Sequence, residues 1–322
     1  MNKEIKELLA IINNGIEMFS MPKTPSNLYE PITYILQLGG KRVRPILALL
    51  AYNLYKQDID SAVMPILALE VFHNFTLVHD DIMDEAPLRR GQETVHTKWD
   101  NNIAILSGDV MMVKAYELLS SAPETVLPTL LKKFNTCAQE VCEGQQKDMD
   151  FESLPSVSVE EYLDMIRQKT AVLLGFSLEM GAILAGAPKE ESDKLYEVGI
   201  NLGLAFQLQD DLLDLYGGDG FGKQIGGDVI NKKKSFLITK AIELTPENKE
   251  ELLRLYNAEI EELPNKVDEI KEAFNQLNIQ QEAKSLIEKY EQEGMGKISN
   301  LGSIYSKQQL LDFFDVLKGR RS

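Results

Sequence analysis

The pattern Asp-Asp-x-x-Asp occurs twice in the sequence, and each copy closes an apolar segment with helical spacing. The first copy lies in LVHDDIMD (77–84), and the second lies 130 residues later in QLQDDLLD (207–214). In a helix, residues four apart lie on one face with Cβ atoms about 5–6 Å apart, so the first aspartate of each copy lies over the last. Carboxylates this close repel one another unless a cation lies between them. The sequence therefore predicts two helices that each end in a cation-binding cluster, with six candidate ligands: Asp80, Asp81, Asp84, Asp210, Asp211 and Asp214.

Helical periodicity extends over nearly the whole chain. Apolar residues recur at helical spacing, as at Leu8, Ile11, Ile12 and Ile16, and no alternating strand pattern with hairpin turns stands out. With 322 residues, 44% of them hydrophobic, the chain can build one large core. We predict an all-α fold of ten or more helices in a single domain over residues 1–322.

The polar, Glu- and Lys-rich segment 243–300 is predicted to form a solvated helical hairpin outside the chemistry.

Charge and cysteine content narrow the partners and the compartment. A net charge of −16 argues against nucleic acid or an anionic membrane as the main partner, because both attract basic surfaces. Cys137 and Cys142 form neither a disulfide framework nor a zinc pattern, which favours a reduced cytoplasmic compartment. The apolar stretch 171–187 carries Glu179 and is too short to span a bilayer. We predict a soluble cytoplasmic protein with no membrane span.

The ligand types identify the expected cation. The second cluster has no His or Cys nearby, and oxygen-only ligation favours Mg²⁺ over zinc. Magnesium is usually bound through one or two carboxylates and completes its shell with water and substrate phosphates. Two such clusters acting together therefore suit a magnesium diphosphate better than a bare ion. The alternative is that they are two unrelated acidic helix ends.

Arginines cluster beside these motifs. The chain has eight arginines, and four of them lie in GGKRVRP (39–45) and in the RRG (89–91) that follows the first acidic cluster. The planar guanidinium matches phosphate oxygens, so both motifs are predicted to bind phosphate. Taken alone, GGKRVRP also fits a loop that feeds a helix, with its charges in water.

Three other features also have a simpler interpretation. The glycine-rich segment 217–228 nearly matches a P-loop, but Gln224 stands where Ser or Thr would hold magnesium, and a helix precedes it. Nucleotide binding is therefore not predicted. His79 lies directly before Asp80, where a polar helix position is favoured over a metal ligand. The C-terminal KGRRS (318–322) fits either a solvated tail or a segment that folds over a substrate site.

Six motifs together resemble the trans-isoprenyl diphosphate synthases, also called polyprenyl synthetases, over essentially the whole chain. In order, they are GGKRVRP, HDDIMD with RRG, GQQKD (144–148), RQKTAVLL (167–174), FQLQDDLLD (206–214) and GKQIGGDVINKKKSFL (222–237). The resemblance implies a helical bundle around a deep cavity, the type I isoprenoid synthase fold, and a homodimer. It also implies that the two aspartate motifs face each other and hold a cluster of about three Mg²⁺ ions with substrate diphosphate.

The resemblance also assigns roles by position. The diphosphate of isopentenyl diphosphate would be bound by Lys41, Arg44, His73 and Arg90. The diphosphate of the allylic substrate (dimethylallyl, geranyl or farnesyl) would be bound by Arg89, Lys169, Gln207, Lys223 and Lys233. Thr170 and Gln207 would line the reacting centre together with Lys169 and Lys233, and Gln145 and Asp148 would lie beside the metal site.

The implied chemistry is Mg²⁺-assisted ionisation of the allylic substrate, condensation with isopentenyl diphosphate and loss of a proton. A lid formed by the segment 217–228 would exclude water. Phe75 and Thr76 would limit the length of the product. With this pair and no insertion in DDIMD, the chain resembles geranylgeranyl diphosphate synthases. Farnesyl diphosphate is the alternative product.

Three other functions are alternatives to prenyl transfer. A terpene cyclase normally has a second metal motif that mixes Asn or Asp with Ser or Thr and Glu, and DDLLD does not. A non-catalytic subunit of a heteromeric synthase would be expected to lack some of the aspartates or basic residues. A Mg²⁺-dependent diphosphate hydrolase would not incorporate isopentenyl diphosphate into longer products.

Overall fold

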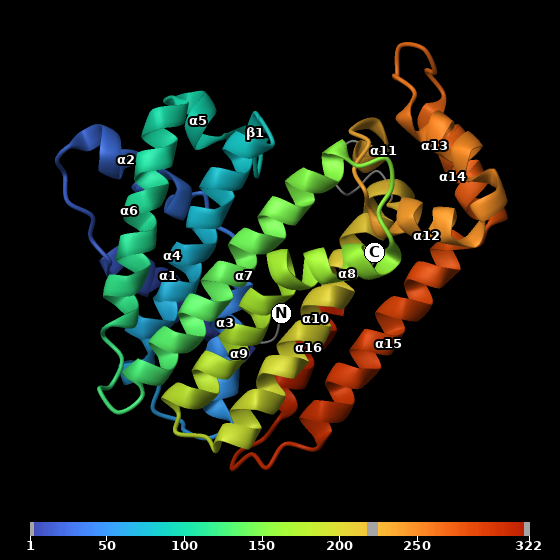
Figure 1. Cartoon of the computed structure of the whole chain (residues 1–322). Helices are drawn as coiled ribbons and strands as arrows, with labels where there is room; N and C mark the ends of the chain where they lie inside the picture. Colours follow the sequence, from blue (N-terminus) through green and yellow to red (C-terminus); the bar gives the residue numbers. More distant parts are fainter. Residues whose placement is uncertain (1–2, 218–224, 319–322) are drawn as a thin grey trace. The chain divides into compact units, whose positions relative to one another are not determined.

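The computed structural model describes residues 3–217 and 225–318, and this part of the chain is mostly helical, as predicted (Figure 1). It divides into two compact units. The first unit takes its residues from 1–135, 176–196 and 301–316, and the second takes its residues from 136–175, 197–300 and 317–322. Four helices contain residues of both units: α7 (Leu127–Ser153), α9 (Val172–Leu184), α10 (Lys189–Tyr216) and α16 (Gln308–Lys318).

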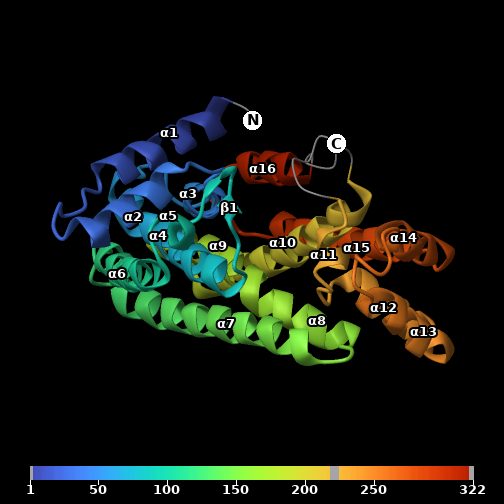
Figure 2. The ribbon, with the colours of Figure 1, turned by 90° about the horizontal axis from the view of Figure 1, so that it is seen from above.

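The first unit is organised around a long apolar helix, α4 (Asp60–Met83). Helix α6 (Asn101–Leu119) runs beside it (Figures 1 and 2). Phe72 of α4 is fully buried and contacts the ring of Phe134, which in turn lies 5.9 Å from that of Phe176. The remaining elements of this unit are α1 (Lys3–Met18), α2 (Ser26–Gln37), α3 (Val43–Asn53), β1 (Leu88–Arg89), β2 (Gln92–Glu93) and α5 (Val95–Lys98).

Helix α4 alone, among the described residues, is long and apolar enough to cross a membrane by length and composition. Its mean hydropathy is 1.5, but 61% of the window concerned is buried inside the protein. Glu70, in the middle of α4, is 2% exposed and forms an ion pair with Arg42. Most of the apolar surface of α4 is covered by other parts of the protein, and its buried Glu70 has a charged partner. Helix α4 is therefore a core helix. The stretch 171–187, from which the sequence predicts no membrane span, is not part of this helix.

The second unit has its own apolar core, to which α8 (Val159–Ile166), α10 and α12 (Phe236–Leu244) contribute. Helix α12 packs against both α8 and α15 (Ile279–Ser299). The other elements of this unit are η1 (Arg167–Ala171), α11 (Gly227–Ile230), η3 (Pro246–Asn248), α13 (Lys249–Asn257) and α14 (Lys266–Gln276). Figure 2 shows α12, α13, α14 and α15 near one another.

The polar segment 243–300 is not the solvated hairpin that its composition predicts, because part of it lies in this core. Tyr256, Ile270, Phe274 and Ile279 are each no more than 1% exposed and belong to the apolar cluster of the second unit. The segment is polar on average because only one stripe of each amphipathic helix is buried. Composition therefore predicted the exposed faces and missed the buried ones.

Candidate active site

The first aspartate cluster lies at the carboxyl end of α4, and its middle residue is buried. Asp81 is 1% exposed, and its carboxylate accepts hydrogen bonds from Nε of Arg89 at 2.8 and 2.9 Å and from Nη2 at 2.6 Å. Asp80 lies 3.8 Å from the same guanidinium. Asp84 is exposed and caps the end of the helix. Arg89 therefore offsets the negative charge of this cluster.

The two adjacent arginines contact different groups because Arg89 ends β1 and Arg90 is the first residue of the turn that follows. Strands β1 and β2 pair antiparallel, with Arg89 opposite Gln92. The two residues between them, Arg90 and Gly91, have φ values of +55° and +75°, as in type I′ turns. Nη1 of Arg90 donates to the carbonyl of Gly39 in the GGKRVRP loop. No sequence pattern predicted this hairpin, because strands of two residues are too short to show an alternating pattern.

His73 lies among four arginines. Burial lowers its pKa well below the usual value, and the charges of Arg44, Arg90, Arg89 and Arg42 lower it further. His73 is therefore neutral at physiological pH, and its ring can donate one hydrogen bond without adding to the positive charge. A group of cations around a neutral donor suits a diphosphate.

Arg42 has a structural role that the motif alone did not reveal. It is 5% exposed, has φ of +46° and lies before the first turn of α3. Its guanidinium donates to Glu70 at 2.6 Å and to the carbonyl of Leu36 at 2.7 Å. Of the basic residues in this motif, Lys41 is exposed and Arg44 is half-buried. Arg42 therefore fixes the loop that presents its neighbours.

Phe75 and Thr76 lie one helical turn before the aspartates. The Phe75 ring is half-buried, 5.6 Å from that of Phe72 and 4.8 Å from that of His79. Thr76 donates its hydroxyl to the carbonyl of His73 at 2.8 Å. The His79 ring nitrogen lies 3.1 Å from the Ile105 carbonyl of α6, which fits the polar helix position that was favoured over a metal ligand.

In the second unit, Lys169 and Thr170 lie on η1, a single turn of π-helix. Such turns are rare and are frequent at functional sites. Lys169 donates to Asp148 at 2.7 Å, which joins the predicted GQxxD and KT motifs. A Cβ on Gly144 would lie 2.3 Å from the backbone nitrogen of Lys169, so only glycine lets α7 pass this turn.

A chain of hydrogen bonds joins this turn to the second aspartate cluster. Thr170 donates to Gln207, and Gln207 donates to Asp211, each at 3.3 Å. Asp211 is 4% exposed and also accepts bonds from the Tyr162 hydroxyl and, at 2.9 Å, from the Phe236 backbone N–H. Burial raises the pKa of Asp211 to about 6, against the lowering effect of its hydrogen bonds.

Lys233 follows α11, and its amine donates to Glu152 at 3.0 Å. Asp214, the last aspartate of the second cluster, accepts a bond from the backbone N–H of Asp228 at 3.0 Å. The second aspartate motif therefore also contacts both ends of the segment that carries Lys233, through Asp214 and Asp211. Lys223 lies outside the described residues.

The side chains fit magnesium only if other oxygen atoms complete its shell. Among residues 3–217 and 225–318, no three His, Cys, Asp or Glu side chains converge closely enough to hold an ion. The exposed and half-buried aspartates of each motif nevertheless offer hard oxygen atoms at i, i+4 spacing. This donor set suits Mg²⁺ that is also bound by diphosphate.

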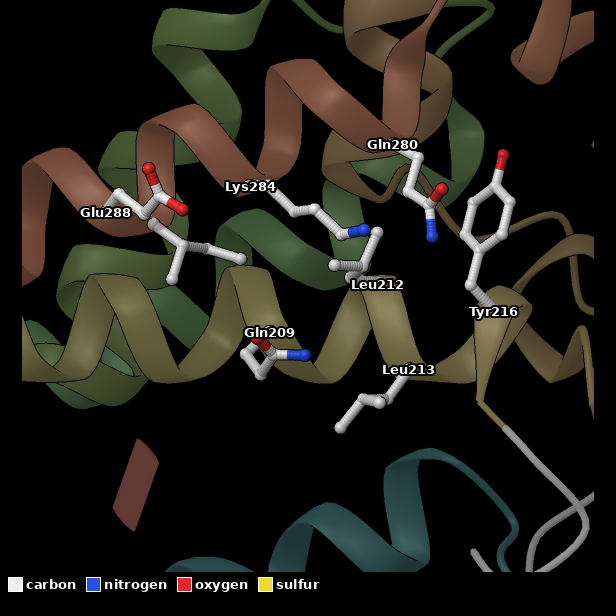
Figure 3. Close-up of a pocket in the computed structure, with 8 residues that line it drawn as sticks. Gln209, Leu212, Leu213, Tyr216, Gln280, Lys284 and Glu288 are labelled. Carbon is white, nitrogen blue, oxygen red and sulfur yellow. The ribbon is translucent and has the colours of Figure 1, made fainter. Parts of the chain in front are cut away.

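A separate pocket lies on another face of α10. It has a volume of about 220 Å³, and Figure 3 shows its residues on α10 and α15. Leu212 and Leu213 contribute apolar surface, while Lys284 reaches over Leu212 from α15. None of the predicted site residues lines this pocket, which is formed by Gln209, Leu212, Leu213, Tyr216, Gln280, Lys284, Ile287 and Glu288.

Comparison with known proteins agrees with the predicted family. The model of the family described as "Polyprenyl synthetase" matches residues 25–277. The chain belongs to the polyprenyl synthetase family. It is therefore a prenyltransferase of isoprenoid biosynthesis, as the ordered motifs predicted.

Individual relatives cover most of this polyprenyl synthetase. The chain is 41% identical over 242 residues to the geranylgeranyl pyrophosphate synthase of Geoglobus acetivorans, covering 74% of this chain and 76% of that protein. It is 41% identical over 255 residues to a short chain isoprenyl diphosphate synthase of Methanocaldococcus jannaschii, covering 78% and 76%. A crystal structure of a geranylgeranyl pyrophosphate synthase matches with a TM-score of 0.94 and 44% identity over 100% of both chains.

Sequence reasoning missed three residues of this synthetase that the structure connects to the site. Tyr162 and Glu152 contact Asp211 and Lys233, respectively, and Tyr256 contacts the backbone of Lys233. Single tyrosines and glutamates in helical segments carry no local signal. Only the three-dimensional contacts distinguish them from other polar residues.

Proposed function

We propose that this prenyltransferase is a geranylgeranyl diphosphate synthase that condenses isopentenyl diphosphate with dimethylallyl, geranyl and farnesyl diphosphates. The observation that carries the proposal is the hydrogen-bonded chain from Thr170 through Gln207 to Asp211, beside the Lys169–Asp148 pair. It joins three of the family's motifs in one place. The relatives from Geoglobus and Methanocaldococcus support a short-chain product. Farnesyl diphosphate is the alternative product.

The aspartates are proposed to divide the work of metal binding. When bound, Mg²⁺ would neutralise the allylic diphosphate and favour its departure. Asp80, Asp84, Asp210 and Asp214 are proposed to bind the ions directly. Asp81 and Asp211, whose carboxylate oxygens all have protein partners, would mainly hold the surrounding groups. Each would reach an ion only through a remaining lone pair of these oxygens.

The basic residues are proposed to hold two different diphosphates. Arg89, Lys169, Lys233 and Lys223 would bind the allylic diphosphate. His73 would donate a hydrogen bond to the diphosphate of isopentenyl diphosphate, since its lowered pKa keeps the ring neutral. The cations on that side would be Lys41, Arg44 and Arg90.

The proposed reaction needs no protein nucleophile. The allylic carbon–oxygen bond breaks and leaves a carbocation, whose charge is stabilised by the oxygen dipoles of Thr170 and Gln207. The double bond of isopentenyl diphosphate forms the new carbon–carbon bond, and the proton then lost passes to the departed diphosphate. Water must be excluded throughout, because it would capture the cation.

The decisive experiment supplies Mg²⁺, labelled isopentenyl diphosphate and each allylic primer in turn, and sizes the products. Incorporation that ends at geranylgeranyl diphosphate is expected. Incorporation that ends at farnesyl diphosphate would select the alternative product. Release of diphosphate without longer products would indicate a hydrolase or a cyclase, and no turnover at all would indicate a non-catalytic subunit.

Product length is proposed to depend on Phe75 and Thr76. Phe75→Ala should lengthen the product, because it removes the half-buried ring that lies one turn before the aspartates. Phe134→Leu, which alters a fully buried ring of the same aromatic cluster, serves as the control and should leave the chain length unchanged. An unchanged product in Phe75→Ala would refute the assignment.

Helix α6 supports the proposal of a homodimer. Its Ile105, Leu106 and Val113 side chains are 42%, 58% and 63% exposed, and exposed apolar residues grouped on one helix are typical of interaction surfaces. Val113→Asp should therefore shift the protein from dimer to monomer in light scattering, whereas a wild type that is already monomeric would contradict the proposal. A cytoplasmic location stays a prediction.

A further inference from the structure

The backbone that carries Lys233 contains a strained residue. The backbone N–H of Lys233 donates to the carbonyl of Asp228 at 2.9 Å and closes a turn after α11. Within this turn, Lys232 has φ of +57°, in the left-handed region that residues with a Cβ avoid. Such a conformation persists only when the surrounding structure holds it. The question is which residue supplies that hold.

Tyr256 of α13 contacts both ends of the turn. Its hydroxyl donates to the carbonyl of Lys233 at 2.6 Å and lies 3.2 Å from the carbonyl of Asp228. The side chain is 1% exposed, so the hydroxyl has almost no access to water as an alternative partner. Removing it would leave the Lys233 carbonyl without this bond in a buried setting.

The Tyr256 ring is itself fixed from the other side. Nζ of Lys266, at the start of α14, lies 5.6 Å from the ring centroid, within the range of a cation–π contact. Lys266 is fully buried, and its Nζ has no hydrogen-bond partner in the structure. Moving the ring would remove the contact that it makes with this buried amine. The ring is therefore held in place, and its hydroxyl stays at one position.

We propose that Tyr256 is a positioning residue for Lys233. Its hydroxyl holds the strained turn 228–233 so that the lysine amine stays in reach of the allylic diphosphate. The proposal rests on the proposed function insofar as Lys233 contacts that diphosphate. Composition predicts that the α13–α14 hairpin lies outside the chemistry. Under this proposal, the hairpin instead influences the rate of prenyl transfer directly, through Tyr256.

The first test measures the turn without any turnover. Tyr256→Phe removes only the hydroxyl, and Tyr290→Phe, in α15 of the same unit, is the matched control. Hydrogen exchange of peptides that span 228–236 should accelerate on the order of threefold to tenfold in Tyr256→Phe and should not change in Tyr290→Phe. Unchanged exchange in Tyr256→Phe overturns the hold by Tyr256, whatever reaction the protein catalyses.

The second test links the turn to Lys233 through a double-mutant cycle. Tyr256→Phe should lower kcat/KM for the allylic substrate on the order of tenfold. In a Lys233→Met background the same change should have almost no further effect, because the residue through which Tyr256 acts is gone. Losses that multiply in the double variant overturn the link and indicate a general effect on folding.

The two failures are read from different measurements. A wild-type rate in Lys233→Met refutes the assignment of Lys233 under the proposed function, and with it the link from Tyr256 to catalysis. The exchange rates still decide whether Tyr256 holds the turn. Thermal unfolding of all variants identifies any loss of activity that comes from unfolding alone.

Discussion

The two aspartate motifs have the same pattern and different surroundings. In the first, the buried middle residue Asp81 is paired with the permanent charge of Arg89. In the second, the buried middle residue Asp211 accepts hydrogen bonds from three neutral donors among the described residues: the Tyr162 hydroxyl, the Gln207 amide and the Phe236 N–H. The first motif thus contains a cation that offsets its negative charge. The charge of the second motif depends more on a bound cation. Equal sequence patterns do not imply equal electrostatics.

The largest effect is expected where the two motifs are proposed to be alike. Asp80→Asn and Asp210→Asn should each reduce kcat by about 10²–10³-fold, because each removes a charge that stabilises the departing magnesium diphosphate. Product formation at several Mg²⁺ concentrations measures this loss. A variant that keeps its full rate would show that its motif does not take part in metal binding.

The next contrast separates the middle residues. Asp81→Asn removes the nearest charged partner of the Arg89 guanidinium and leaves only the Asp80 carboxylate, 3.8 Å away, so we expect a loss of about 2–3 kcal/mol in the free energy of unfolding. Asp211→Asn can keep both bonds to its Oδ2, since an amide oxygen also accepts from Tyr162 and Phe236, and should cost about 1 kcal/mol or less. Denaturant unfolding of both variants measures the difference. Equal losses would remove the contrast between the motifs.

The buried aspartate of the second motif should also make the free energy of unfolding depend on pH. The pKa of Asp211 is raised to about 6 in the folded protein, above its value in the unfolded chain, so the folded state binds the extra proton. The resulting stability is fully present below the unfolded pKa of about 4 and is lost as pH rises through 6.

In metal-free buffer, the wild type should therefore gain about 2–3 kcal/mol over Asp211→Asn as pH falls from 7 to below 4. Chemical denaturation at a series of pH values measures this difference. A difference between the two proteins that does not vary with pH would contradict the assignment.

The smallest effect tests the packing beside each motif. Gly144→Ala would place a Cβ 2.3 Å from the backbone nitrogen of Lys169, whereas Gly108→Ala would meet the His79 imidazole at 2.3 Å. Backbone cannot yield as a side chain can, so we expect a loss of about 1–2 kcal/mol for Gly144→Ala and less for Gly108→Ala. Thermal unfolding compares the two variants. A reversed order would mean that the π-helical turn adapts to the added methyl group.

Much of the fold was predictable because helical periodicity is a local property. The apolar spacing predicted an all-α chain, and the paired motifs placed the aspartates at or near helix ends, as Asp80 and Asp81 are in the last turn of α4. The β1–β2 hairpin was missed because two-residue strands have no period to detect. The buried stripes of α13 and α14 were missed because average composition hides a single apolar face.

The sequence by itself determined which chemical groups are available: six aspartates, the arginines of GGKRVRP and RRG, and the lysines of the later motifs. Residue type and spacing suffice for this, because the preference of carboxylates for Mg²⁺ and of guanidinium for phosphate is a property of the groups themselves. Only the tertiary structure decided how these groups are held. Arg42 supports its loop from within the core, Asp211 is bound by neutral donors, and Tyr256 reaches the Lys233 backbone although it lies 23 residues later in the chain. Burial and hydrogen bonding arise from contacts between distant segments, and no local pattern of residues encodes them.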